Sequence, residues 1–325
     1  MFNINPHEQL SELIFGIIKP FHLIRTVILT LLLLQSSLIE AQGESTQSYP
    51  DSLNKGKLAA VVASEAIFYT GGIAYLQYIW YKDHDRVPFH LYNDSKGYLQ
   101  IDKCGHAFGA YLESYLGYEW LRRSGVSRNK ALFFGAPLGA LLQFPIEVFD
   151  GIYKGWGFSL SDVAANTAGA SLVAVNELIF KEQLIKYKFS FQRSVYAKVG
   201  NGYLGSNSLE SLFYDYNGHT YWLSCPLNKI TPIKSIPDWF CLSIGYSANG
   251  MYGEFKNQAI YGGKPLPAVK RARQFLLSLD IDPTRIETKS KFINTFFDHL
   301  FWIKVPFPAL EWNTKNGFDV HGIYW

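Results

Sequence analysis

The 325-residue sequence is poor in charged residues. Asp, Glu, Lys and Arg make up 18% of the chain, below the roughly 25% that is usual in soluble proteins. The formal net charge of +3 is too small to indicate nucleic-acid binding, and no basic stripe is present. Hydrophobic residues reach 48% and aromatic residues 16%. This composition favours an envelope or membrane protein over a cytosolic one and predicts no nucleic-acid partner.

Cysteine is nearly absent. The three cysteines, Cys104, Cys225 and Cys241, fit neither a disulfide framework nor the spacing of a zinc site. Cys225 and Cys241 could pair in an oxidising compartment, but two unpaired buried thiols explain them equally well. The sequence alone leaves both states open.

The short motifs of common enzyme classes are also missing. The sequence contains no G-x-S-x-G nucleophile elbow, no H-E-x-x-H zinc motif, no P-loop and no dinucleotide-binding fingerprint. These absences make catalysis the second hypothesis and a structural or binding role the first.

The N-terminus has the features of a secretory signal peptide. Basic residues precede a short apolar run, residues 27–34, and small residues follow it up to Ala41. We predict a signal peptide over residues 1–42, cleaved near Ala41, and a polar tether over residues 43–54. No cysteine follows the apolar run, so the sequence offers no lipid-attachment site there.

Residues 55–184 have the periodicity of helices and predict a bundle rich in small residues. We expect about four helices, over residues 58–81, 103–122, 131–149 and 160–184. The first is long enough to span a bilayer, although a buried helix of a soluble bundle is the alternative. Two prolines, Pro137 and Pro145, are expected to kink the third helix. Gly and Ala residues would let the helices approach closely, as they do in membrane bundles.

Seven polar residues stand out in this apolar background because most of them recur at helical spacing. Positions three or four apart share one face of a helix, and these residues fall on three of the predicted helices. We therefore expect the three polar faces to meet. The predicted cluster consists of Asp102, Lys103, His106, Glu147, Asp150, Asp162 and Asn166.

The first three residues of the cluster each have two interpretations. Asp102 is well placed as the N-cap of the helix that follows, or it belongs to a site. Lys103 could bind a phosphate or a lipid head group, or it could extend to the membrane interface. His106 could be a general base or a metal ligand, since neutral imidazole suits both tasks near pH 7. The alternative for His106 is a core histidine bonded to a carboxylate.

Glu147 is the strongest candidate because it follows the largely apolar stretch 141–146, where an isolated carboxylate is costly. It must be paired, protonated or bound to a metal. Asp150 could assist Glu147 or end its helix. Asp162 is expected to cap the next helix, where Ser159 and Asp162 have the spacing of a capping box. Asn166 could bridge two helices by hydrogen bonds.

Two functional chemistries fit this cluster. Carboxylates and a histidine can hold a divalent cation, or they can perform acid–base chemistry, for which His106, Glu147 and Asp150 are the hypothetical catalytic residues. A structural polar network explains the same residues without catalysis. The sequence identifies no cofactor and leaves the presence of a metal open.

Residues 185–325 change to the periodicity of strands and predict a β-rich, aromatic unit. Strands are expected over residues 185–192, 239–246 and 274–281, with a hairpin around Asn217-Gly218 within residues 212–223 and a helix over residues 289–302. An aromatic C-terminus on a β segment also occurs in outer-membrane barrels, but about five or six strands are few for one. The predicted fold class is α+β, a helical bundle followed by a β-rich unit.

Residues 100–181 carry several motifs in a fixed order. These are D-K-x-x-H at 102–106, E-x-x-D at 147–150, G-x-S-x-x-D at 157–162 and A-G at 168–169. In this order and spacing they resemble the YfiM-like family of envelope lipoproteins, which is distantly similar to VanZ-like membrane proteins. The resemblance implies a helical bundle in the cell envelope and no settled activity. The lipidation cysteine of the shorter members is missing here, and Lys154 is a weak substitute for an arginine common in VanZ-like proteins.

Together these observations predict an exported protein of the envelope of a Gram-negative-type bacterium, associated with its inner or outer membrane. A structural or binding role around the polar cluster is the first hypothesis, with membrane lipid or another envelope protein as the partner. The alternative is a membrane-associated, metal-dependent hydrolase or transferase acting on a lipid-linked or cell-wall substrate.

Overall fold

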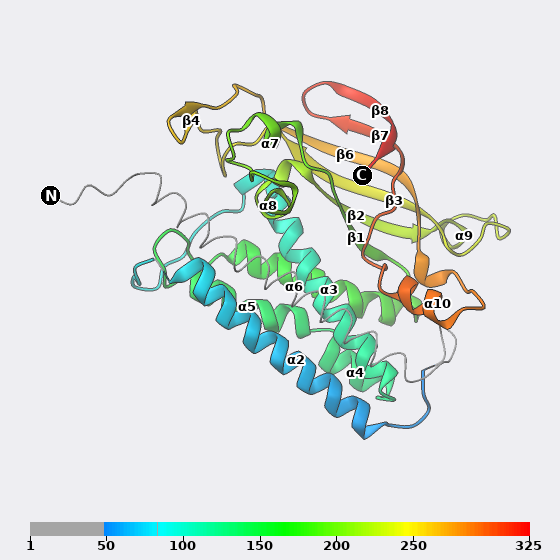
Figure 1. The fold of residues 1–325 in the computed structure, drawn as a ribbon. Helices are drawn as coiled ribbons and strands as arrows, with labels where there is room; N and C mark the ends of the chain where they lie inside the picture. The colour runs from blue at the N-terminus through cyan, green and yellow to red at the C-terminus, as the bar shows by residue number, and fades with distance from the viewer. Residues whose placement is uncertain (1–48, 83) are drawn as a thin grey trace.

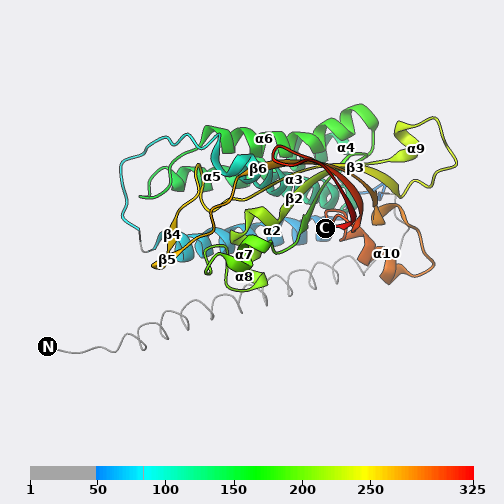
Figure 2. The same cartoon turned by 90° about the horizontal axis from the view of Figure 1, so that it is seen from above.

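The computed structural model describes residues 49–82 and 84–325. The predicted signal peptide and the first half of the predicted tether lie outside the described residues. Helices come first in the chain and a six-stranded antiparallel sheet follows, with the sheet lying over one side of the helices (Figure 1). Seen from above, the strands lie in front of part of the helical layer (Figure 2). The predicted α+β class is therefore confirmed.

The helical part is close to the predicted pattern, with one additional break. The helices are α2 (Lys55–Leu76), α3 (Ile101–Arg123), α4 (Arg128–Gly135), α5 (Leu138–Asp150) and α6 (Leu160–Val175). At Pro137 the third predicted helix is divided into α4 and α5, because proline cannot donate the backbone hydrogen bond that would continue the helix. Two π-helical turns, η1 (Gln77–Tyr81) and η3 (Asn176–Phe180), extend α2 and α6.

The fourth predicted helix ends earlier than expected. After η3, Lys181 adopts a left-handed conformation with φ of 64°. The side-chain amide of Asn176 then donates to the Ile185 carbonyl and accepts from the Ile185 N–H, both at 2.9 Å. These bonds turn the chain toward the sheet, so the helix cannot continue to residue 184.

Helix α3 is central because α4, α5, α6 and the sheet all pack against it. Its closest approach is to α6, where a Cβ atom added to Gly169 would lie 1.8 Å from the Ala107 carbonyl oxygen. A Cβ atom at Gly139 of α5 would lie 2.0 Å from the Ala110 carbonyl oxygen. Glycine is required at both crossings, in agreement with the small-residue packing expected from the sequence.

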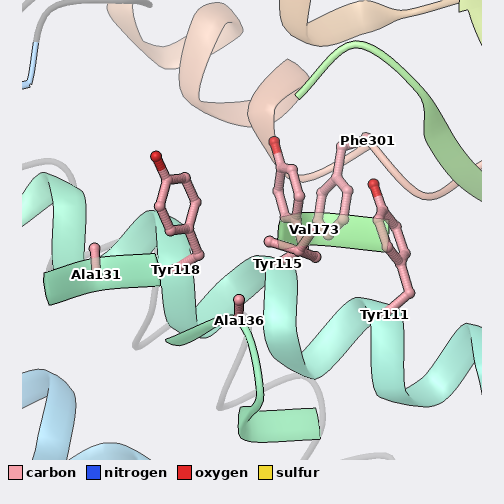
Figure 3. Close-up of a cluster of buried hydrophobic side chains, with 7 residues drawn as sticks. All are labelled: Tyr111, Tyr115, Tyr118, Ala131, Ala136, Val173 and Phe301. Atoms are coloured by element: carbon pink, nitrogen blue, oxygen red, sulfur yellow. The ribbon is translucent and has the colours of Figure 1, made fainter. Parts of the chain in front are cut away.

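A cluster of aromatic side chains joins the helices to the C-terminal half of the chain. Tyr111, Tyr115 and Tyr118 project from one side of α3, with Phe301 beside Tyr115 (Figure 3). The rings of Tyr115 and Phe301 stack with their centroids 4.2 Å apart. Since Phe301 follows α10 (Lys291–Asp298), the helices and the β-rich part share this core. Helix α10 is shorter than the predicted 289–302.

The sheet has the strand order β1-β2-β3-β6-β7-β8, and every neighbouring pair is antiparallel. Its strands are β1 (Lys186–Phe191), β2 (His219–Pro226), β3 (Phe240–Asn249), β6 (Ala272–Ile281), β7 (Phe307–Asn313) and β8 (Gly317–Tyr324). A short ribbon of β4 (Ile260–Tyr261) and β5 (Lys264–Pro265) stands apart from it. Short helices α7 (Val195–Val199), α8 (Ser208–Tyr214) and α9 (Leu227–Ile230) fill the connections.

The predicted hairpin at Asn217-Gly218 is wrong. These residues form a buried 3-10 turn, η4 (Tyr216–Gly218), that follows α8 and leads into β2. The side chain of Asn217 donates to the Met251 carbonyl at 3.0 Å and accepts from the Met251 N–H at 2.7 Å. The Asn-Gly pair is thus held by distant backbone groups. The segment directly before the turn is helix α8, and β2 pairs with β1 and β3.

The sheet is inverted, in the sense that its buried side is largely polar and its exposed side is apolar. Strand side chains alternate between a buried and an exposed position, but the buried ones are mostly small or polar and the exposed ones are large and apolar. The buried set includes Lys188, Ser190, Ser224, Ser243, Ser247, Gln274, Ser278, Asp280, Glu311 and Asn313. The exposed set comprises Leu223, Ile244, Phe275, Leu277, Leu310, Trp312, Phe318, Val320 and Ile323.

The helices also expose apolar side chains. Three helical segments of the described residues are long and apolar enough to cross a membrane: Lys55–Ala74, Arg128–Asp150 and Leu160–Phe180. Phe133 of α4 is 74% exposed and Ile179 of η3 is 64% exposed. All three cysteines are free thiols.

A left-handed turn precedes α3. Tyr98, Leu99 and Gln100 have φ values of 45°, 53° and 68°, a conformation that costs a non-glycine residue roughly 1–2 kcal/mol. The Tyr98 N–H donates to the Glu254 carbonyl at 2.8 Å, and the Tyr246 hydroxyl donates to the Leu99 carbonyl. Contacts to β3 and its following loop thus hold the turn that sets the direction of α3.

Candidate functional site: a polar cluster centred on Lys103

The polar cluster lies where the beginning of α3, the beginning of α6, the end of α5 and the loop before α3 meet. The Lys103 ammonium is at its centre. Its Nζ atom lies 2.6 Å from Asp94 Oδ2, 2.9 Å from Asp102 Oδ2 and 2.6 Å from Asp162 Oδ1. Burial lowers the pKa of Lys103, but the three carboxylates outweigh burial and hold this pKa above its usual range. Lys103 is therefore protonated, and carboxylates of the same protein balance its positive charge.

Asp94 is the member of the cluster that the sequence did not reveal. It is buried in the loop before α3 and accepts hydrogen bonds from the hydroxyls of Ser159 at 2.6 Å and Ser161 at 2.7 Å. Burial alone would raise the pKa of Asp94, but the bonds from Lys103 and the two serines lower it to about 2. Its position in a loop gives no periodic signal, and only its proximity to a D-K-x-x-H motif could have suggested it.

Asp102 does not cap α3, so this interpretation from the sequence is wrong. Helix α3 begins at Ile101, one residue before Asp102. Its N-cap is Gln100, whose side chain makes no capping hydrogen bond. The Asp102 carboxylate instead accepts from the Tyr216 hydroxyl at 3.1 Å and from Lys103. In this way it connects the cluster to the turn before β2.

Asp162 lies in the first turn of α6 and is buried. Its backbone N–H donates to the Ser159 hydroxyl at 3.1 Å, which is the N-cap bond expected from the capping-box spacing. The Asp162 side chain, however, turns to Lys103 and does not cap the helix. One residue pair thus both starts α6 and anchors it to α3.

His106 lies between the two acidic helices. Its Nδ1 atom is 3.4 Å from Glu147 Oε1 of α5, and its Nε2 atom is 3.6 Å from Asp162 Oδ1 of α6. The His106 side chain is 26% exposed, so one edge of the imidazole can be reached from outside. Both expected readings of the residue, a histidine bonded to a carboxylate and an accessible base or ligand, are compatible with this position.

Glu147 is 1% exposed, and among the described residues neither a lysine nor an arginine lies within ion-pair distance of its carboxyl group. Asn166 donates to Glu147 Oε1 at 3.5 Å, whereas Oε2 has no hydrogen-bond partner among the described residues. Burial and the nearby carboxylates of Asp162 and Asp150 raise the pKa of Glu147 to about 9. Glu147 is thus a neutral carboxylic acid at pH 7, one of the states that its apolar sequence context required.

Asp150 turns away from the centre of the cluster toward η1. The Tyr81 hydroxyl, itself buried, donates to Asp150 Oδ1. Burial raises the pKa of Asp150 to about 6, against the opposing effects of Tyr81 and His106. Asp150 therefore connects the end of α5 to the end of α2.

We expect Glu147→Gln to remove part of the pH dependence of stability. The raised pKa means that the folded protein retains a proton that the unfolded chain loses above about pH 4.5. Wild-type stability should therefore fall as the pH rises from about 4.5 to 9, by up to about 1.4 kcal/mol per pH unit from this group. Glutamine cannot ionise and resembles the protonated acid, so urea unfolding should show a smaller decline for the variant.

The exposed Asp51 supplies the control for this measurement. Asp51→Asn should leave the pH profile of the wild type unchanged between pH 4.5 and 9. Parallel profiles for wild type and Glu147→Gln would show that Glu147 is already ionised in the folded protein near neutral pH.

Three members of the cluster could also hold a metal ion. One ligand atom each from Asp102, His106 and Asp162 lies within 4.8 Å of the other two. Imidazole and carboxylate donors suit Zn²⁺ or Mn²⁺. The ammonium of Lys103 already lies against both carboxylates, so metal binding would require this side chain to move out.

The part of the sequence that contains this cluster matches a known domain family. Residues 91–177, about a quarter of the chain, match a domain family described as predicted periplasmic lipoprotein (DUF2279). The match contains every residue of the cluster and supports an exported, cell-envelope location. No curated protein and no solved structure matches the chain.

Proposed function

We propose that this protein has a structural and binding role in the cell envelope, with the polar cluster as the ionic centre of its helical part. The observation that carries the proposal is the position of Lys103, whose ammonium contacts carboxylates from the loop, α3 and α6 at 2.6–2.9 Å. Lys103 occupies the place that a bound cation would take, and its charge is used within the protein. The cluster thus fixes the arrangement of three segments.

A family relationship and an association with a membrane are consistent with this role. The motif order over residues 100–181 favours a relationship to the YfiM-like and, more distantly, the VanZ-like proteins. Residues 55–184 would then form the helical unit of such a protein, and residues 185–325 its β-rich unit. The exposed apolar side chains of the helices favour association with a membrane, whose lipid or another envelope protein is the partner we propose.

A second candidate function is a metal-dependent hydrolase or transferase acting on a lipid-linked or cell-wall substrate. It is supported by the ligand geometry of Asp102, His106 and Asp162 and by the accessible edge of His106. In this function the protonated Glu147 would serve as the general acid, because it can give a proton at neutral pH.

Metal binding to wild type and Lys103→Met separates the two functions. If Lys103 is the resident cation, the purified wild-type protein should contain no stoichiometric metal, and Mn²⁺ or Zn²⁺ should leave its melting temperature unchanged. Lys103→Met should gain thermal stabilisation from the same ions, because its carboxylates lack a counter-ion. Lys96→Met, a change at an exposed lysine of the preceding loop, is the matched control.

Stoichiometric metal in the wild type that is lost in His106→Ala would overturn the ionic-centre proposal and favour the metalloenzyme. Glu147→Gln should then abolish turnover while leaving folding intact. Cells that express the wild-type protein can be fractionated into membrane and soluble material, which tests the proposed membrane association directly.

A further inference from the structure

We propose that an apolar cleft between the sheet and α6 binds a long acyl chain of a membrane lipid. The cleft has a volume of about 720 Å³, within the roughly 300–1,000 Å³ of small-molecule sites. One wall is formed by α3 and α6, through Cys104, Ala107, Ala168, Gly169 and Leu172. The other is the exposed side of the sheet, with residues that include Ile244, Phe275, Leu277, Leu310, Trp312 and Phe318.

The lining selects an uncharged, flexible ligand. No Asp, Glu, Lys or Arg occurs among the described residues that line the cleft. Its tyrosine hydroxyls are largely engaged elsewhere, since Tyr187 donates to the Cys104 carbonyl and Tyr246 to the Leu99 carbonyl. A sugar, nucleotide or peptide would leave its polar groups unpaired there, at a large cost in affinity. A hydrocarbon chain makes no such demand.

The inverted sheet explains why this surface needs a partner. In β3, β6 and β7 the buried positions hold Ser243, Asp280 and Glu311, whereas Ile244, 57% exposed, and Trp312, 50% exposed, face outward. A sheet that buries its polar side chains and exposes its apolar ones gains free energy when an apolar phase covers the exposed side.

The helical wall indicates which apolar partner this is. Ala168, Gly169 and Leu172 belong to the segment Leu160–Phe180, which is apolar and long enough to cross a membrane. Farther along the same segment, Leu178 and Ile179 are exposed. The helical segment that lines the cleft therefore also carries exposed apolar side chains that favour contact with lipid.

Photo-crosslinking of the full chain tests the site. The protein is incorporated into phosphatidylcholine vesicles that contain a small fraction of the same lipid with a diazirine on one acyl chain. After irradiation, mass spectrometry should find labelled peptides from β3 or β6 together with α6. Labelling of the strands is the informative part, because insertion of the helix alone would label α6 without the sheet.

Two substitutions in the cleft and one outside it make the test specific. Ile244→Glu places a charge in the cleft, and Ala168→Trp fills it from the helical side. Each should lower strand labelling by about tenfold or more, because even a modest loss of binding free energy lowers the affinity of the cleft for the acyl chain tenfold. Val320→Glu is the control, because Val320 is exposed but does not line the cleft, and its labelling should stay within about twofold of the wild type.

Melting temperatures of all three variants establish that they are folded, and Ala168→Trp adds no charge to the fold. An equal loss of labelling in Val320→Glu and Ile244→Glu would overturn the cleft in favour of general lipid contact along the sheet. Labelling confined to the helices, or no labelling of the wild type, would overturn it as well. These outcomes are independent of metal binding at the polar cluster.

Discussion

Lys103→Met should lower the free energy of unfolding by about 3–5 kcal/mol, because removing one partner of a buried ion pair leaves the others uncompensated. The Lys103 side chain is 11% exposed, and its loss would leave Asp94, Asp102 and Asp162 facing one another. Methionine keeps most of the volume of lysine, so little of the loss would come from packing. Chemical denaturation of wild type and variant measures the difference.

The pH dependence of the Lys103→Met variant provides an independent signature. In the wild type the depressed pKa of Asp94 means that its contribution to stability is present above pH 3.8 and is lost as the pH falls through about 2. Without the ammonium only the bonds from Ser159 and Ser161 remain, so that contribution should decrease, and the difference between variant and wild type should shrink in acid. Lys96→Met, at an exposed position, should change stability by less than about 0.5 kcal/mol.

A double substitution, Lys103→Met with Asp162→Asn, should recover part of the loss, since it removes one of the unpaired charges. Strictly additive losses would contradict direct coupling between Lys103 and Asp162. Wild-type stability of Lys103→Met would remove the basis for an ionic centre.

Asp280→Asn should have an effect of similar size, about 3–5 kcal/mol, in the sheet. Asp280 is fully buried, and its carboxylate lies 2.8 Å from Lys188 Nζ, which is also fully buried. Ser224 donates to the same carboxylate oxygen at 2.8 Å, and the Val305 N–H donates to the other at 3.1 Å. Asparagine keeps the shape of the side chain but leaves the Lys188 ammonium without its counter-charge.

The neighbouring Lys304 provides a second readout for Asp280→Asn. Burial lowers the pKa of Lys304 to about 8, against the opposing effect of Asp280. Loss of the Asp280 charge should lower this pKa further and so reduce the charged fraction of Lys304 at pH 7. NMR titration of the lysine side chains measures the shift. The exposed Asp319 of β8 is the control, and Asp319→Asn should leave both stability and titration unchanged.

The polar cluster could be predicted from the sequence because helical spacing fixes which side chains share a face. Asp102 and His106 are one turn apart on α3, as are Asp162 and Asn166 on α6, and burial of these helices brings their faces together. Asp94 lies in a loop, where no periodicity applies, so its position depends on tertiary contacts. For the same reason the sequence could not show that the Lys103 ammonium lies at the centre of the cluster.

The sheet could be predicted only in part. Alternation in residues 185–192 and 274–281 correctly indicated strands, since β1 and β6 are found there. Alternation does not tell which side is buried, and the usual assumption of apolar side chains inside would have given the wrong side for β6, where Ser278 and Asp280 are inside. The failed hairpin at Asn217 has a similar cause, because its amide is bonded to Met251, a residue far away in the sequence.

The inverted sheet also governs how copies of the protein behave toward one another in water. Nine large apolar side chains on the strands are exposed, and a formal net charge of +3 gives weak mutual repulsion for a chain of 325 residues. Strand β8 lies at one end of the sheet order, and such edge strands are where strand-to-strand association begins. We therefore expect the exposed apolar side chains and the small net charge to give the protein low colloidal stability in aqueous solution. Recombinant preparations will stay monodisperse only when detergent or lipid covers this side of the sheet before concentration.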